Sequence, residues 1–324
     1  MKSINFEKPG EAENLSLIDA EIPVPQEDEV LIRVYAAGVN RADILQRQGL
    51  YPPPSDASPI LGLEVAGEVV VCGKQARNLQ PGDKVCALVN GGGYAEYAVA
   101  PQAQCIPIPK NFTFDQAAAL PETFFTVWHN LFQRAKLTAG KTLLVHAGAS
   151  GIGVTAIQLA TAFGVKVFAT ASTPEKCQAI TQLGAEAICY TQEDFVKAIK
   201  QKTHGQGVNF ILDMIGGDNL QKNFSAAAVD GRIINIAFLN GSKIQLDLMP
   251  LMLKRLILTG STLRSQSASA KAKIADDLLQ QVWPLLNQEK IQPVIDSVFT
   301  FDDVIKAHQH MESNRHVGKI ILTP

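Results

Sequence analysis

The chain has 324 residues, a formal net charge of −2 and 46% hydrophobic residues, which together predict a folded protein with room for two domains. The balanced charge provides no broad cationic surface, so it argues against binding of DNA or RNA. No apolar run reaches the about 20 residues that span a bilayer. Residues 1–10 carry charges in place of a signal-peptide core, so we expect no membrane partner and a cytoplasmic location.

The first 120 residues or so predict a β-rich domain. Strand-like runs rich in Val, Ile and Leu cover residues 30–39 and 63–72, with shorter candidates at 83–89 and 94–99 and a short helix at 41–48. Proline and glycine interrupt these runs at irregular intervals, which favours a partly open barrel over a sandwich.

From about residue 140 the pattern changes to short apolar strands that alternate with amphipathic helices. We expect strands at 142–147, 165–170, 187–190, 208–213, 232–237 and 256–262, with helices at 152–163, 174–184, 194–203 and 219–228. This alternation indicates a parallel sheet with helices on both faces, and six strands fit a doubly wound dinucleotide-binding domain.

The C-terminal tail holds too few elements to fold alone. A helix at 271–286, a strand at 297–301, a helix at 302–312 and a strand at 319–322 are expected to complete the first domain. The predicted domains are therefore residues 1–121 with 265–324, and residues 122–264.

A glycine-rich turn follows the first strand of the alternating region. It reads Gly148-Ala149-Ser150-Gly151-Ile152-Gly153. Glycines let the backbone turn sharply and approach a pyrophosphate, and the N-terminus of the next helix presents free N–H groups to it. The order of glycines differs from G-x-G-x-x-G, but the place between strand and helix predicts that Gly148, Ser150, Gly151, Ile152 and Gly153 bind a dinucleotide. The alternative is a tight turn without a ligand.

The end of the second strand indicates which dinucleotide is bound. An NAD site has Asp or Glu there, whereas this strand ends Ala169-Thr170-Ala171-Ser172. Ser172 can donate to a phosphate, Lys176 lies one helical turn later, and Tyr190 ends the third strand. A missing carboxylate with a nearby cation favours the 2′-phosphate of NADPH. Alternatively, Lys176 is a solvated charge and Tyr190 an interfacial aromatic residue.

The later strands end in further candidates for the cofactor site, because ligands bind beyond the carboxyl ends of parallel strands. Ile215 follows the fourth strand and Phe238 follows the fifth, and both are predicted to line the cofactor. Arg264 follows the sixth strand, where it either contacts a phosphate or forms a salt bridge. Asp213 is expected to be structural.

With these residues, the chain resembles the medium-chain dehydrogenase/reductase superfamily, and within it the zinc-free quinone oxidoreductases, especially members that reduce ortho-quinones. The resemblance runs nearly end to end, and its landmarks are residues 38–43, 46–54, 61–64, 147–153 and 317–320. It implies an α/β protein in which a Rossmann domain accompanies a discontinuous, GroES-like, partly open β-barrel. It also implies a homodimer that forms through the edge of the Rossmann sheet.

The zinc alcohol dehydrogenases of this superfamily have Cys where this chain has Asn40, and Gly-His-Glu where it has Gly62-Leu63-Glu64. Neither Asn nor Leu is a normal zinc ligand. Between residues 91 and 110 there is only Cys105, so the structural zinc loop is also missing. We therefore expect no zinc, and we expect Glu64 to belong to a buried ion pair.

The resemblance also implies roles for four residues. Tyr51 and Ser150 are expected to support activity, Asn40 to contact the nicotinamide ribose or the acceptor, and Thr126 to lie beside the nicotinamide. Each of the first three has a structural alternative, because Tyr51 can pack against the prolines at 52–54, Ser150 can cap its helix, and Asn40 can cap the helix at 41–48.

Without a Lewis acid, the acceptor must already be electrophilic, so a small quinone is the first hypothesis for the substrate. A reductase of 2-enoyl thioesters or other enones is the second hypothesis. The chain shows no basic patch for coenzyme A, which favours the quinone. The third hypothesis is an NADPH-binding protein without catalytic activity.

Overall fold

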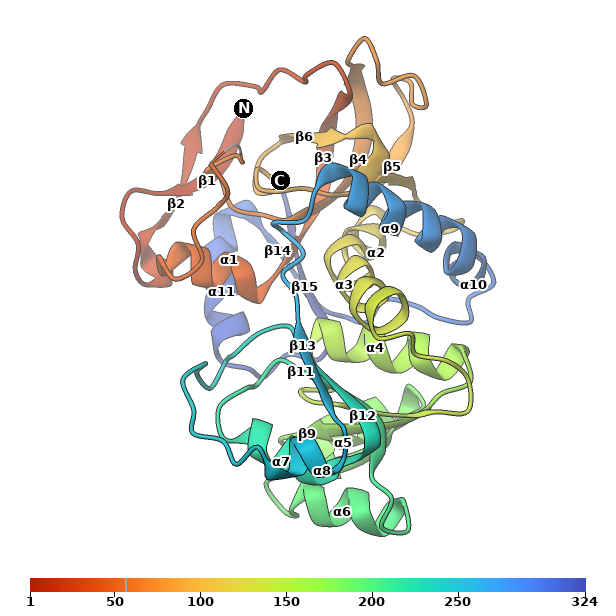
Figure 1. Ribbon diagram of the computed structural model, residues 1–324. Coiled ribbons are helices and arrows are strands. Elements are labelled where there is room, and N and C mark those ends of the chain that lie inside the picture. The colour runs from red at the N-terminus through yellow and green to blue at the C-terminus, as the bar shows by residue number, and fades with distance from the viewer. Residues whose placement is uncertain (56) are drawn as a thin grey trace. The chain divides into compact units, whose positions relative to one another are not determined.

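The computed structural model describes residues 1–55 and 57–324, which divide into two compact units (Figure 1). The first unit contains Met1–Phe125 and Arg264–Pro324, and the second contains Thr126–Leu263. No helix in the described part of the chain has both the length and the apolar character needed to cross a membrane.

The second unit is built on a parallel sheet of six strands. They are β8 (Thr142–Val145), β9 (Lys166–Ala171), β10 (Glu186–Cys189), β11 (Val208–Asp213), β12 (Ala227–Asn235) and β13 (Ile257–Gly260). Their order is β10-β9-β8-β11-β12-β13 and all pairs are parallel, which confirms the predicted doubly wound arrangement. In this order β8 is central, so the turn that follows β8 lies at the point where the direction of winding reverses.

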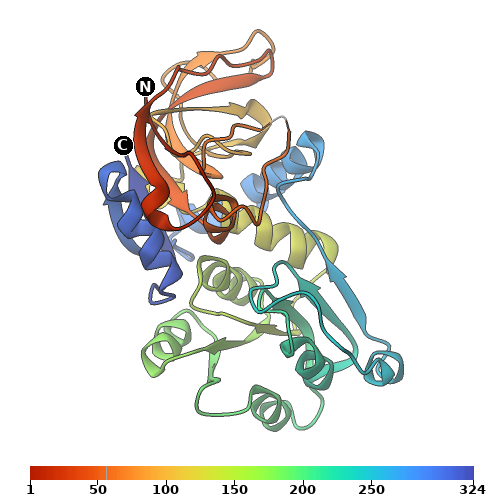
Figure 2. The ribbon, with the colours of Figure 1, turned by 90° about the vertical axis from the view of Figure 1, so that its left-hand side faces the viewer.

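Helices cover both faces of this sheet (Figure 2). They are α4 (Gly151–Ala162), α5 (Pro174–Gln182), α6 (Phe195–Lys202), α7 (Asn219–Ala226) and the short α8 (Met249–Leu253). α6 and α7 contact each other on one face, where Phe195, Ile199 and Phe224 are buried in the core. The chain enters this unit within α3 (Pro121–Val127), which continues as a π-helix, η3 (Trp128–Arg134).

The first unit contains a seven-stranded, mainly antiparallel sheet and a two-stranded sheet. The larger sheet comprises β3 (Glu29–Val39), β4 (Glu64–Cys72), β5 (Lys84–Leu88), β6 (Tyr97–Pro101), β7 (Cys105–Pro107), β14 (Ile295–Thr300) and β15 (Lys319–Thr323). β15 pairs antiparallel with β3, so the C-terminal tail is part of the N-terminal sheet. Figure 2 shows these strands curling around a shared core, which includes Ile32, Val65 and Ile320.

The remaining elements of the first unit are a two-stranded sheet and several helices, of which α9 (Ala268–Gln281) is 14 residues long. The smaller sheet pairs β1 (Lys2–Phe6) with β2 (Leu15–Asp19). The helices are α1 (Arg41–Arg47), α2 (Phe114–Ala118), α9 (Ala268–Gln281), α10 (Trp283–Asn287) and α11 (Val304–Glu312). Single 3-10 turns lie at η1 (Ala12–Asn14), η2 (Gln102–Gln104) and η4 (Phe301–Asp303).

Two expectations about secondary structure are wrong in detail. The single helix expected at 271–286 is two helices, because Pro284 in the first turn of α10 has no N–H and would clash with an earlier carbonyl in a continuous helix. The strand expected at 94–99 begins only at Tyr97. Tyr94 lies before this strand and pairs with other segments. Its N–H donates to the carbonyl of Leu61, and its carbonyl accepts from the N–H of Ile4.

Candidate active site

The glycine turn after β8 has the tight geometry that its sequence predicts. A Cβ at Gly148 would lie 2.8 Å from the Cβ of Ala169, and one at Gly153 would lie 2.4 Å from the carbonyl oxygen of Ala147. Both contacts are too close for a side chain, so α4 packs against the strands only with glycine at these positions. The Ser150 hydroxyl caps α4 by accepting from the N–H of Gly153 at 3.1 Å. The N–H groups of Gly151 and Ile152 lie in the first turn of α4, where the helix itself offers no acceptor for them.

The ends of β9 and β10 bring Ser172 and Tyr190 together. Cys189 pairs with Ala171 in the sheet, the N–H of Tyr190 donates to the carbonyl of Ala171, and the hydroxyl of Thr191 donates to the carbonyl of Ser172 at 2.8 Å. The side chain of Tyr190 is 53% exposed. Lys176 lies in the first turn of α5, which begins beside Ser172. The three residues predicted to bind the 2′-phosphate therefore lie around one corner of the sheet.

The loops after β11 and β12 carry Ile215 and Phe238 and contact each other. The N–H of Asn240 donates to the carbonyl of Ile215, and a Cβ at Gly216 would lie 2.6 Å from the ring of Phe238. Asp213 accepts from the N–H groups of Ile215 and Gly216 and from the buried side chains of Asn223 and Asn235. These contacts confirm that Asp213 is structural, and they fix the loop that presents Ile215.

Thr126 is linked to the same edge of the sheet through one side chain. Asn130, in the π-helix, donates to the carbonyl of Thr126 at 3.0 Å and accepts from the Ser261 hydroxyl at 2.8 Å. The N–H of Ser261 donates to the carbonyl of Asn235, at the end of β12. Asn130 thus fixes the place of Thr126, a role that the sequence did not suggest.

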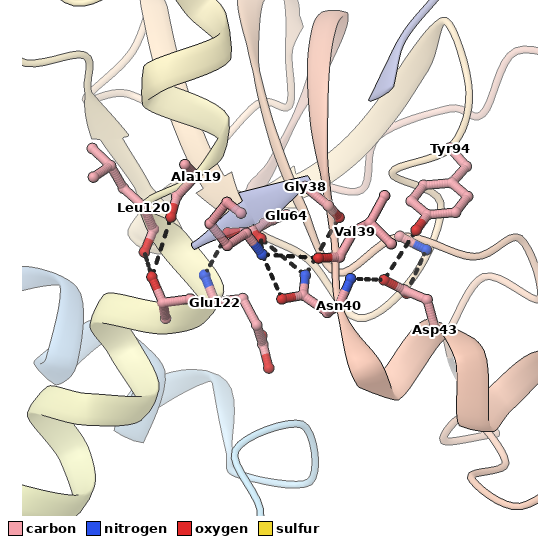
Figure 3. A network of polar contacts seen from close by, with 12 residues as sticks. Gly38, Val39, Asn40, Asp43, Glu64, Tyr94, Ala119, Leu120 and Glu122 are labelled. Atoms are coloured by element: carbon pink, nitrogen blue, oxygen red, sulfur yellow. Dashed lines mark hydrogen bonds and ion pairs between the residues drawn. The ribbon is translucent and has the colours of Figure 1, made fainter. Parts of the chain in front are cut away.

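A buried polar network occupies the start of β4 in the first unit (Figure 3). The carboxylate of Glu64 accepts from Lys319 Nζ at 2.6 Å, from Asn40 Nδ2 at 2.9 Å and from the backbone N–H of Glu122 at 2.8 Å. The side chains of Lys319 and Glu64 are 4% and 0% exposed. The structure confirms the expected ion pair of Glu64 and identifies its partner as Lys319, which lies at the start of β15.

Asn40 contributes most of its hydrogen-bonding groups to this network. Its Oδ1 accepts from Lys319 at 2.6 Å, and its Nδ2 donates to Glu64 and to the carbonyl of Gly38. It also stands at the N-cap of α1, where its backbone N–H donates to Asp43. A direct contact of Asn40 with cofactor or acceptor stays a prediction, whereas its observed hydrogen bonds position Lys319 and begin α1.

Asp43 is a second buried carboxylate in this network. It accepts from the N–H groups of Asn40 and Gly62 and from the hydroxyl of Tyr94 at 3.1 Å. Burial raises the pKa of Asp43 to about 6, although these donors and the charge of Lys319 act in the opposite direction.

Tyr51 lies beside Arg264. The Arg264 guanidinium carbon is 5.5 Å from the centre of the Tyr51 ring, within the range of a cation–π contact. Burial raises the pKa of the Tyr51 phenol, the charge of Glu122 raises it further, and the charge of Arg264 lowers it. Burial also raises the pKa of Glu122 to about 8, and the neighbouring Glu64 adds to that rise.

Arg264 uses its donors inside the first unit. Its guanidinium donates to the carbonyl of Asn90 and to Oε1 of Gln46, and Lys271 donates to Asn90 and to the carbonyl of Arg264 itself. A phosphate contact of Arg264 therefore stays a prediction, while its place against the Tyr51 ring is observed. Tyr51, Asn40 and Arg264 belong to the first unit, and the other predicted site residues belong to the second.

Across the described ranges 1–55 and 57–324, no cluster of three or more His, Cys, Asp or Glu side chains has the arrangement to hold a metal ion. The five cysteines, all within these ranges, are free thiols. The donors around Glu64 are an ammonium, an amide and a backbone N–H, which suit a carboxylate rather than a cation site.

The parallel sheet with its glycine turn defines a dinucleotide-binding protein with a separate, mainly antiparallel β unit. Two family models match: "Alcohol dehydrogenase GroES-like domain" over residues 26–110 and "Zinc-binding dehydrogenase" over residues 151–282. The human protein named quinone oxidoreductase is 31% identical, over 94% of this chain and 92% of its own length. The chain belongs to the medium-chain dehydrogenase/reductase superfamily, in the branch that contains quinone oxidoreductases.

Solved structures agree with this assignment. The Escherichia coli quinone oxidoreductase complexed with NADPH is similar at a TM-score of 0.90 and 27% identity, with 100% of both chains covered. The CurK enoyl reductase is similar at a TM-score of 0.87 and 27% identity, with 99% of this chain and 98% of that chain covered. These matches confirm the predicted fold class, a GroES-like domain with a Rossmann domain, and they include relatives named for two different acceptors.

Proposed function

We propose that this protein is an NADPH-dependent oxidoreductase that reduces a small quinone without zinc. The observation that carries the proposal is the Glu64–Lys319–Asn40 network. Asn40 stands where zinc members of the superfamily have Cys, and Glu64 ends the segment that reads Gly-His-Glu in those members. Here both side chains accept hydrogen bonds from the ammonium of Lys319, which also donates to the carbonyl of Val39. A site built in this way suits an acceptor that needs no Lewis acid, as a quinone does.

The second unit offers the groups that NADPH requires. The tight glycine turn and the first N–H groups of α4 suit the pyrophosphate, and Ser172, Lys176 and Tyr190 suit the 2′-phosphate and its ribose. Ile215, Phe238 and Thr126 lie along the same carboxyl edge of the sheet, where a nicotinamide would be held. When bound there, NADPH supplies the hydride.

The side chains of the chain itself orient the acceptor and neutralise the charge that forms on it. The phenol of Tyr51 donates a hydrogen bond to the quinone oxygen that becomes an oxyanion, and Arg264 holds the Tyr51 ring in place. Ser150 keeps α4 capped and its N–H groups directed at the cofactor phosphates.

The proposal is tested by measuring NADPH oxidation with 1,2-naphthoquinone and with crotonyl-CoA on protein whose zinc content has been determined. Turnover of the quinone by zinc-free protein supports it. Stoichiometric zinc, or turnover of crotonyl-CoA without turnover of the quinone, refutes it. NADPH binding without turnover of any electron-poor acceptor supports a non-catalytic NADPH-binding protein instead.

Reduction of an enone or of a 2-enoyl thioester is the second candidate. It is favoured by the similarity to the CurK enoyl reductase, which nearly equals the similarity to the E. coli quinone oxidoreductase. The same cofactor site and the same Tyr51 donor would serve it, so only the comparison of acceptors separates the two.

The proposal includes a homodimer formed through the edge of the parallel sheet. β13 ends the strand order, and the side chains of Ile257 and Leu258 on it are exposed. Met252 and Leu253 of the neighbouring α8 are exposed as well. An uncovered apolar edge strand is prone to pair with another strand, and a second copy of β13 would cover it symmetrically.

A further inference from the structure

Arg264 is a buried cation whose hydrogen bonds all go to neutral groups. The residue is only 7% exposed, its Nε and Nη2 donate to the carbonyl of Asn90, and its Nη1 donates to Oε1 of Gln46 at 2.7 Å. A guanidinium carries five N–H groups, so one N–H on each terminal nitrogen has no acceptor among residues 1–55 and 57–324. Asp43 and Glu122 raise the pKa of Arg264 without forming an ion pair with it, but burial outweighs them and lowers this pKa.

Two other buried cations of the first unit are each compensated by a carboxylate. Arg47 forms an ion pair with Glu312, and Lys319 forms one with Glu64. Arg264 forms no such ion pair within the part of the chain that the structure describes. Because its charge is poorly hydrated and not neutralised in contact, Arg264 attracts an anion more strongly than the paired cations do.

A second positive charge and the ring of Tyr51 lie beside this guanidinium. Nζ of Lys271, a residue that is 1% exposed, donates to Oδ1 of Asn90 at 2.6 Å and to the carbonyl of Arg264 at 2.8 Å. On the other side, the guanidinium carbon of Arg264 is 5.5 Å from the centre of the Tyr51 ring. A negative charge that forms next to the Tyr51 hydroxyl is therefore close to buried positive charge, where attraction between charges is strong.

We infer that Arg264 is a catalytic residue that stabilises the negative charge formed on the acceptor, a role that rests on the proposed function. A hydride brings two electrons and one proton to a quinone, so NADPH is oxidised to NADP⁺ and the quinone becomes a hydroquinone anion. The two N–H groups of Arg264 that no described residue accepts donate to the charged oxygen of this anion. A proton from water then forms the O–H bond that completes the hydroquinone. Because the charge appears only during hydride transfer, Arg264 stabilises the transition state more than the bound quinone.

The first test compares turnover numbers with NADPH and 1,2-naphthoquinone. Arg264→Met should lower turnover by about 100-fold and change the Kd for NADPH by less than about 3-fold. In a Tyr51→Phe background, the same substitution should still lower turnover by about 10-fold or more, because Arg264 acts on the acceptor and not only on the ring. Arg77→Met is the matched control, since it removes an exposed arginine of the same unit, and it should leave turnover unchanged.

The second test needs no turnover. The anion of 4-nitrophenol resembles the hydroquinone anion and is yellow, whereas the neutral form is colourless, so absorption spectra report which form is bound. In complex with NADP⁺, wild type and Arg77→Met should bind the anion about 10-fold or more tightly than the neutral form, and Arg264→Met should lose most of this preference. If Arg264→Met does not fold, Arg264→Gln, whose amide can still donate to Asn90, replaces it in both tests with the same expected results.

The outcomes separate this inference from the proposed function. Full turnover in Arg264→Met, or no further loss in the Tyr51→Phe background, overturns the role of Arg264 while quinone reduction by the wild type stands. A fall in NADPH affinity as large as the fall in turnover would assign Arg264 to a phosphate of the cofactor instead. A wild type that binds neither form of 4-nitrophenol, or both equally, also contradicts the inference. If the wild type reduces no quinone, the proposed function fails, and the binding of 4-nitrophenol still decides whether Arg264 holds an anion.

Discussion

Replacing Lys319 with methionine should destabilise the first unit strongly. Lys319 Nζ donates to Glu64, Asn40 and the carbonyl of Val39, which uses all three of its N–H groups. With Lys319 and Glu64 only 4% and 0% exposed, Lys319→Met leaves a buried carboxylate without its counter-charge. Removal of one partner from such a pair costs about 3–5 kcal/mol of the free energy of unfolding. Asn40 Oδ1 and the carbonyl of Val39 also lose their donor, so we expect a loss in the upper part of that range.

The measurement must report the first unit alone, because unfolding of two units is not a two-state process. The chain has two tryptophans, Trp283 in the first unit and Trp128 in the second. In a Trp128→Phe background, urea unfolding followed by the fluorescence of Trp283 reports the first unit. Lys306→Met is the matched control, because the exposed Lys306–Asp303 pair should contribute at most about 1 kcal/mol.

A second variant tests the cause of the loss. Lys319→Met combined with Glu64→Gln removes both charges, so it should recover more than half of the free energy that Lys319→Met loses. A loss below about 1 kcal/mol in Lys319→Met would refute the reasoning about the buried charge. A double variant as unstable as the single one would show that packing or hydrogen bonds, rather than charge, carry the effect.

Four further outcomes are expected. Lys176→Ala should raise the KM for NADPH by about 10-fold or more and leave that for NADH nearly unchanged, because only NADPH has the 2′-phosphate; equal effects on both cofactors would contradict this role. Tyr51→Phe should lower turnover by about 10- to 100-fold without weakening NADPH binding measured by fluorescence, and full turnover would show that the hydroxyl is idle. Leu253→Glu should shift the protein from dimer to monomer in sedimentation, and an unchanged dimer would argue against the α8–β13 surface. Burial lowers the pKa of His308 from 6.5 to about 3, so as the pH falls the imidazole takes up a proton in the unfolded chain before it does so in the folded one. The free energy of unfolding of the first unit should therefore fall by up to about 1.4 kcal/mol per pH unit below pH 6.5. His308→Leu should make that slope shallower, whereas an identical slope would assign it to other groups.

The Rossmann unit could be predicted from the sequence because its signals are local. The alternation of apolar strands with helices and the turn at 148–153 can each be recognised within a short stretch. Together they indicate a doubly wound dinucleotide-binding sheet, and that fold implies the strand order. The short β1 and β2 could not be predicted, because strands of five residues in an irregular segment carry little periodicity. The break between α9 and α10 does have a local signal, which is Pro284.

The polar network could be predicted only in part, because its partners are far apart in the chain. The sequence indicated that Glu64 forms an ion pair, but its partner Lys319 lies 255 residues away and could have been any of the lysines and arginines. Arg264 follows the sixth parallel strand in the chain, and nothing in the sequence indicated that its guanidinium contacts Asn90 and Gln46, which are far from it along the chain. Glu122 had no signal of its own in the sequence, because the groups whose charges act on its carboxyl come from several other segments.

Glu64, Asp43 and Glu122 meet in the buried network, and they differ in the contacts that surround them. Glu64 has an ammonium within 2.6 Å and two further donors. Asp43 has no cation in contact but accepts from two backbone N–H groups and a phenol, and its pKa rises only to about 6. Burial and the charge of the neighbouring Glu64 raise the pKa of Glu122 to about 8. The pKa of Asp43 stays below that of Glu122 because two backbone N–H groups and the phenol of Tyr94 stabilise the charge of Asp43, whereas the charge of Glu64 makes a second buried charge on Glu122 more costly.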